Sequence, residues 1–267
     1  MATHIFITHR ERWLLAVAVF LLALAFGPAV SQAADYHQFA DQRALAGIPN
    51  ALDVLSNLSF AGFGLLGWYT LGAGRSANQS AQLPSDVIRL AKVFFFGLVL
   101  TGAASAYYHC SPDNAGLVVD RMGMLVAFSG LTGLAACLHV SARAGVLVGS
   151  TVLVDGPLAV LHWAMTGNAM PWACIQFGGL LLILLCSCWA ENSLEPMGIH
   201  WWAVIGCYAL AKILEAADHQ VYELSRHLVS GHSLKHLVAS LAAWPVYAAV
   251  ARKMAVLPTA QSTAATA

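Results

Sequence analysis

The chain has 267 residues, of which 59% are hydrophobic and 10% are charged, and its mean hydropathy is +0.68. A soluble globular domain carries about 25% charged residues, so this composition excludes an ordinary soluble protein and indicates an integral membrane protein. The formal net charge of zero gives no basis for nucleic-acid binding. The six cysteines lie mostly in apolar runs without a C-x-x-C pair, and we interpret them as packing residues.

The first apolar run lies in the stretch HRERWLLAVAVFLLALAFGPAVSQAAD, which has a basic flank, an apolar centre and small residues near its end. The pattern Ser31-x-Ala33 fits the cleavage site of a secretory signal peptide. A transmembrane helix that is not cleaved fits equally well, so residues 1–34 are expected to be one or the other. In both cases the chain after Asp35 begins on the outer side of the membrane.

Seven further apolar runs are each long enough to cross a bilayer as a helix, which takes about 20 residues. They occupy residues 53–73, 87–108, 118–140, 143–162, 170–190, 200–216 and 232–250. Strands are not expected, because an open sheet leaves backbone groups unpaired in lipid and no alternating barrel pattern is present. The sequence therefore predicts an all-α membrane protein with a seven-helix bundle at residues 35–252 and a disordered polar tail at 253–267.

The basic residues predict how this bundle is oriented. If the helices alternate from an outer start, eight Lys and Arg residues fall on the cytoplasmic side and four on the outer side, in agreement with the positive-inside rule. The outer side then receives the end of the 87–108 helix and the starts of the 118–140 and 232–250 helices. We expect a multi-pass protein of the bacterial inner membrane, with its site facing the non-cytoplasmic side.

These three helix ends carry the candidate site. Ser105 and His109 are four residues apart on one helical face, and Asp120 follows eleven residues after His109, beyond the turn CSPDNAG. His232 and His236, in SGHSLKHL, form a second pair at the same spacing. Three neutral imidazoles can bind one zinc ion and leave a fourth position open for water, as in catalytic zinc sites. Asp120 is then the candidate base for that water, and Ser105 a hydrogen-bond partner of the water or of a substrate carbonyl.

The same residues resemble the alkaline ceramidase family, which belongs to a superfamily of seven-helix membrane hydrolases and receptors that includes the adiponectin receptors. The resemblance rests on S-x-x-x-H at 105–109, Asp120, H-x-x-x-H at 232–236, and DVLSNLSF at 53–60, and it covers about residues 35–250. The signal-like N-terminus and the compact SGHSLKHL are similar to the bacterial branch of the family.

The resemblance implies zinc on His109, His232 and His236, Asp120 beside the zinc-bound water, and Ser105 near the substrate carbonyl. It implies hydrolysis of the amide bond of a ceramide-like lipid to a sphingoid base, or another amine lipid, and a fatty acid. Members from eukaryotes also bind calcium ahead of the first helix. The corresponding segment YHQFADQRALAGIPN offers few oxygen anions, so we assign no calcium site.

Two other classes of protein also fit parts of the pattern. A lipid-sensing receptor or scaffold would keep the zinc for structure and would turn over no lipid. A haem protein could use His109 and one residue of the His232–His236 pair as axial ligands, but Asp120 and Ser105 would then have no role.

A few ionisable residues elsewhere in the apolar runs have no predicted place in the site. Lys212 and Glu215 are three residues apart and can pair on one helix face, although Glu215 could instead support a histidine ligand. Asp155 and His162 share one face of their helix and could pair with a neighbour or line a cavity. The sequence assigns no role to Asp218, and the oligomeric state is open.

Overall fold

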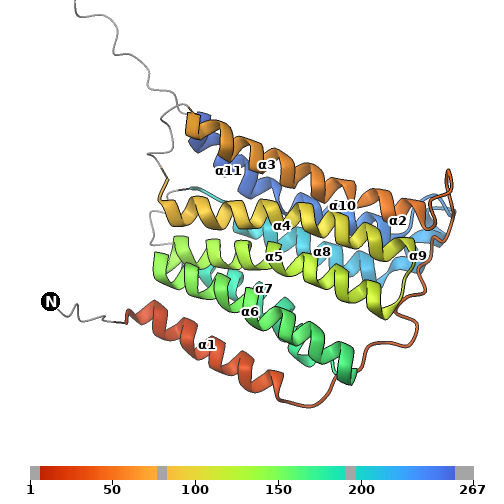
Figure 1. The fold of residues 1–267 in the computed structure, drawn as a ribbon, viewed down its shortest axis with the longest axis horizontal. Helices are drawn as coiled ribbons and strands as arrows, with labels where there is room; N and C mark the ends of the chain where they lie inside the picture. The colour runs from red at the N-terminus through yellow and green to blue at the C-terminus, as the bar shows by residue number, and fades with distance from the viewer. Residues whose placement is uncertain (1–6, 77–82, 190–196, 256–267) are drawn as a thin grey trace, which may run out of the picture.

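The computed structural model describes residues 7–76, 83–189 and 197–255, and each regular element within these ranges is a helix (Figure 1). The all-α prediction is therefore confirmed for the described residues. The helices are α1 (His9–Ala25), α2 (Ala51–Ser56), α3 (Leu58–Ser76), α4 (Ser85–Cys110), α5 (Asn114–His139), α6 (Ala142–Thr166), α7 (Met170–Cys188), α8 (Trp201–Ala216), α9 (Asp218–Leu224), α10 (Gly231–Leu241) and α11 (Trp244–Ala255).

Among the described residues, six spans are long and apolar enough to cross a membrane. They correspond to α2 with α3, α4, α5, α6, α7, and α10 with α11, so the protein is a multi-pass membrane protein. The seventh expected span, at 200–216, is α8, which has 16 residues. At 1.5 Å per residue this helix covers about 24 Å, less than the roughly 30 Å of a hydrocarbon core. The count of seven spans stays a prediction.

Two of the spans are interrupted where the sequence predicts continuous helices. Asn57 separates α2 from α3, and the residues at 242–243 separate α10 from α11. Pro245 explains the second break, because proline has no backbone N–H and its ring clashes with the carbonyl one turn earlier. At the C-terminus, α11 continues to Ala255, past the expected start of the tail at 253, and residues 256–267 lie outside the described part of the chain.

The α4–α5 hairpin forms the centre of the bundle, with α3 and α11 on one side and α6, α7 and α1 on the other (Figure 1). Glycines let its two helices approach closely. A Cβ atom at Gly97 would lie 2.2 Å from the backbone nitrogen of Ala127, and one at Gly130 would lie 2.2 Å from that of Phe94. The small side chains thus fix the distance between the helix that ends in His109 and the helix that carries Asp120.

The reversal predicted between α4 and α5 is present. Asp113 caps the N-terminus of α5 by accepting a hydrogen bond from the backbone N–H of Gly116 at 2.6 Å. The end of α4, the start of α5, α2, α9 and the start of α10 therefore meet at one end of the bundle, and the segment that joins α1 to α2 runs to the same end (Figure 1).

A separate cavity of about 1200 Å³ lies between α1, α6 and α7. Asp155 and His162 line this cavity, and they belong to α6 rather than to the elements that meet at the end of α4. The helix α1 closes one side of the cavity, and at its N-terminal end Arg10 donates a hydrogen bond to the carbonyl of His139 at 2.7 Å.

Candidate metal centre

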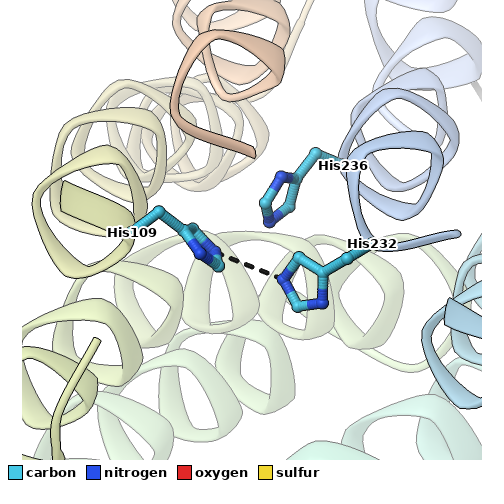
Figure 2. A group of neighbouring side chains, drawn as sticks. All are labelled: His109, His232 and His236. Carbon is cyan, nitrogen blue, oxygen red and sulfur yellow. Dashed lines mark hydrogen bonds between the residues drawn. The ribbon is translucent and has the colours of Figure 1, made fainter. Parts of the chain in front are cut away.

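Three buried histidines come together at this end of the bundle. His109 ends α4, and His232 and His236 lie on the first two turns of α10 (Figure 2). Their ring centroids form a nearly equilateral triangle with sides of 4.8, 4.9 and 4.9 Å. One ring nitrogen from each lies within 4.8 Å of the others, so the group could hold a metal ion.

The distances fit a first-row metal such as zinc. Tetrahedral zinc with imidazole nitrogens at about 2.0–2.1 Å requires those nitrogens to be roughly 3.3 Å apart. The Nε2 atoms of His109 and His232 are 3.2 Å apart. A further polar atom of the group, Nε2 of His236, is buried without a hydrogen-bond partner. An unpaired buried polar atom is costly, and a bound metal would satisfy it. This geometry does not distinguish zinc from other first-row metals.

Ser56 sets the tautomer of His236. Its hydroxyl has one proton, which it donates to the backbone carbonyl of Asp53 at 3.0 Å. The same oxygen lies 2.8 Å from Nδ1 of His236 and is therefore placed to accept the Nδ1–H. Nε2 is then the nitrogen with a free lone pair, which is the form that binds a metal.

The first turn of α10 is held by buried carboxylates on other elements. Asp218, at the start of α9, accepts the backbone N–H of His232 at 2.8 Å. Asp53, on α2, accepts hydrogen bonds from the hydroxyls of Ser230 at 3.2 Å and Ser233 at 2.6 Å. Gly231 has no room for a side chain, since a Cβ there would lie 2.3 Å from the carbonyl oxygen of Leu214 in α8.

Asp120 and Ser105 pair with each other across the α4–α5 hairpin, and Ser105 lies one helical turn before His109 on α4. Both side chains are buried. Asp120 is not one of the three metal-binding candidates, and its Oδ1 atom is buried without a hydrogen-bond partner. An unpaired carboxylate oxygen outside the ligand set is free to accept a proton from water.

A lysine that the sequence did not single out contacts the centre directly. The ammonium of Lys235 lies 3.0 Å from Nε2 of His232 and 3.0 Å from Oε1 of Glu215 on α8. The predicted pairing of Lys212 with Glu215 is confirmed, and it uses the other carboxylate oxygen, Oε2. Glu215 therefore reaches the histidines through Lys235.

The segment at 36–50, here called the cover segment, lies against His109 and His232. Phe39 packs on the rings of His109 and His232, with centroids 4.7 and 4.3 Å apart, respectively. Asn50 donates a hydrogen bond to the carbonyl of His109 at 2.9 Å. The α4 and α10 ligands are thus linked by one stretch of chain that precedes them both.

Arg43 holds the cover segment in place and engages Asp41. It donates hydrogen bonds to both carboxylate oxygens of Asp41, at 2.8 and 2.7 Å, and to the carbonyl of Leu228 at 2.9 Å. Burial pushes the pKa of Asp41 up, but the hydrogen bonds and charge of Arg43 outweigh it and hold that pKa below its usual value. The guanidinium thus takes up both oxygens of this buried carboxylate.

The sequence pattern predicted the cluster of three histidines that the structure brings together, but it assigned no role to the groups that contact them. The place of Asp120 and Ser105 in the site stays a prediction. Lys235 lies three residues after His232, a spacing that places both on one helix face and could have revealed it. Phe39 and Asn50 gave no comparable signal, because their contacts depend on how the cover segment folds back. Asp155 and His162 lie outside the centre, in the cavity between α1, α6 and α7.

A search against models of protein families finds no match for this chain, and a search of curated proteins finds none either.

Proposed function

We propose that the protein is a zinc-dependent hydrolase within the membrane, which cleaves the amide bond of ceramide-like lipids to an amine lipid and a fatty acid. The observation that carries the proposal is the buried triangle of His109, His232 and His236, and the unpaired carboxylate oxygen of Asp120 supports it. The resemblance of these residues to the alkaline ceramidases supports the choice of substrate class. A seven-span bundle in the bacterial inner membrane, with the centre facing the non-cytoplasmic side, is part of the proposal.

The chain's own residues have defined parts in this reaction. Zinc bound to the three histidines would polarise the amide carbonyl and lower the pKa of water. Asp120 takes a proton from the attacking water and later gives it to the leaving nitrogen. Ser105 holds the carboxylate of Asp120 in position, and burial of the site keeps bulk water away from the reacting groups.

Lipid-amide turnover by detergent-purified protein tests the proposal. The wild type should release fatty acid from ceramide, measured by mass spectrometry. We expect Asp120→Asn to keep its zinc and to lose about 10²- to 10⁴-fold in turnover, because it removes the base without removing a ligand. His232→Ala should lose both zinc and turnover.

His139 provides the matched control, since it is a buried histidine of α5 outside the metal group. His139→Gln should retain zinc and turnover. A zinc-loaded wild type that hydrolyses no ceramide, no other N-acyl lipid and no ester lipid would reject the hydrolase and favour a receptor or scaffold with a structural metal. Turnover that survives Asp120→Asn would remove Asp120 from the reaction.

A further inference from the structure

Among the residues that the structure describes, Lys235 is the lysine that contacts a histidine of the group. Its ammonium lies 3.0 Å from Nε2 of His232, and its side chain is 20% exposed. His109, His236 and Asp120 also lie within electrostatic reach of this charge. Lys235 therefore faces the same space as the metal-binding nitrogens and the candidate base.

The hydrogen-bond donors of Lys235 are not all used within the protein. Its ammonium has three N–H groups, of which one binds Oε1 of Glu215, whose Oε2 atom is bound by Lys212. A second is directed at Nε2 of His232, and this nitrogen no longer accepts a hydrogen bond when its lone pair binds a metal ion. The ammonium can then donate to an anionic oxygen that enters beside the histidines.

We propose that Lys235 binds the anionic oxygen of the acyl group, first the oxyanion formed during hydrolysis and then the carboxylate of the fatty acid product. This inference rests on the proposed function and specifies its substrate as a lipid whose acyl carbonyl sits between the metal centre and Lys235. Lys235 is thereby a substrate-binding residue, and Glu215 positions its ammonium.

The reaction places negative charge at this oxygen twice. When the water oxygen bonds to the carbonyl carbon, the π electron pair of the C=O bond moves onto the carbonyl oxygen, beside the ammonium of Lys235. When the C–N bond breaks, that pair re-forms the C=O bond, and the nitrogen keeps the C–N pair and takes a proton from Asp120. The fatty acid product then gives its carboxyl proton to the amine product. One carboxylate and one ammonium ion therefore leave the site.

Binding of sodium oleate to the zinc-loaded full-length protein tests this role without substrate turnover. Oleyl alcohol, which has the same chain but no charge, is the neutral reference ligand. We expect Lys235→Met to weaken oleate binding about 10- to 100-fold and to leave oleyl alcohol binding unchanged, because a hydrogen bond to a charged group is lost. Lys235→Arg, which keeps the charge, should bind oleate within about threefold of the wild type.

Lys212→Met is the matched control, since it removes the other ammonium of Glu215 without touching a histidine, and it should weaken oleate binding less than about threefold. If Lys235→Met does not hold zinc, Lys235→Gln replaces it. A zinc-loaded Lys235→Met or Lys235→Gln protein that binds oleate as tightly as the wild type overturns the inference, as does an equal loss in Lys212→Met.

Turnover separates this inference from the proposed function. A wild type that hydrolyses ceramide but binds oleate independently of Lys235 overturns the role of Lys235 alone. Oleate binding that depends on Lys235 in a protein without any turnover supports the carboxylate site and overturns the hydrolase.

Discussion

At the scale of single residues, Ser56 links the second helix of the chain to a metal-binding nitrogen almost two hundred residues away. Its hydroxyl lies between the carbonyl of Asp53 and Nδ1 of His236, at 3.0 and 2.8 Å. Because the hydroxyl proton is used on the carbonyl, the oxygen is free to accept the Nδ1–H, and Nε2 points its lone pair at the other two histidines.

Removal of this hydroxyl should therefore weaken metal binding without removing a ligand. We expect Ser56→Ala to lower zinc affinity about 10- to 100-fold, as is typical when a partner of a ligating histidine is lost. Ser59→Ala is the control, since Ser59 bonds only the carbonyl of Ser56 and contacts no histidine of the centre. Zinc affinity can be measured by competition with a chelator of known affinity, and equal affinities in both variants would exclude the orienting role of Ser56.

The ion pair of Asp41 and Arg43 should make the stability of the cover segment pH-dependent. The folded pKa of Asp41 lies below its unfolded value, so the pair contributes stability above that unfolded value and loses it as the pH falls through the folded pKa. Arg43→Met leaves a buried carboxylate unpaired and should cost about 1–3 kcal/mol at neutral pH. The difference from the wild type should shrink as the pH falls below about 4, where Asp41 becomes protonated.

Thermal unfolding of the detergent-solubilised protein at several pH values measures this dependence of stability on pH. Asp41→Asn provides the control, because it removes the titrating carboxyl group. Its unfolding temperature should lack the pH dependence that the Asp41–Arg43 pair contributes. A difference between Arg43→Met and the wild type that stays constant from about pH 7 down to about pH 2 would contradict the assignment.

The sequence was sufficient to predict that His109, His232 and His236 come together, but it was not sufficient to predict how their rings are oriented. The spacing of four residues in each histidine motif is a helical signal, and the turn before Asp120 predicts that the chain reverses there. Phe39, Asn50 and Ser56 reach the centre through tertiary contacts, which leave no periodic pattern in the sequence.

At the scale of helices, the α4–α5 contact decides how far Asp120 lies from His109. Glycines at Gly97 and Gly130 place the two backbones in contact, and any added side chain must push the helices apart. His109 and Asp120 lie on either side of the turn of this hairpin, so a change in the spacing of its helices alters the distance between the candidate base and a ligand.

Gly130→Ala should therefore destabilise the protein by about 1–3 kcal/mol and reduce turnover, because overpacking forces the backbones to move. Gly62→Ala on α3 is the matched control, since a Cβ there meets nothing within 4 Å. It should be neutral or slightly stabilising, as alanine favours helix over glycine by up to about 1 kcal/mol. The comparison of their unfolding temperatures and turnover tests the close contact, and equal behaviour of the two variants would argue against it.

Helix positions were largely predictable because long apolar runs have few alternatives in a membrane. Four expected spans, at 87–108, 118–140, 143–162 and 170–190, coincide closely with α4 to α7. The breaks at Asn57 and before Pro245 were not predicted, although Pro245 carries a physical signal. The short α8 was not recognised as short, since its apolar composition resembles that of the longer spans.

At the scale of the whole molecule, the proposed orientation places the metal centre outside. Two exposed cysteines, Cys110 and Cys188, end α4 and α7, and with alternating spans these ends lie on opposite sides of the membrane. A membrane-impermeant maleimide applied to right-side-out cells should label Cys110 and leave Cys188 unlabelled. Labelling should disappear in Cys110→Ser and persist in Cys188→Ser, whereas the reverse pattern would place the centre on the cytoplasmic side.

The metal content of purified protein is the first measurement to make, because every proposed role depends on the three histidines binding an ion. We expect about one zinc ion per chain in the wild type and in His139→Gln, and a large loss in His236→Ala with the fold retained. A folded wild type that takes up no zinc or other first-row metal, or metal that remains after His236→Ala, would contradict the proposed centre.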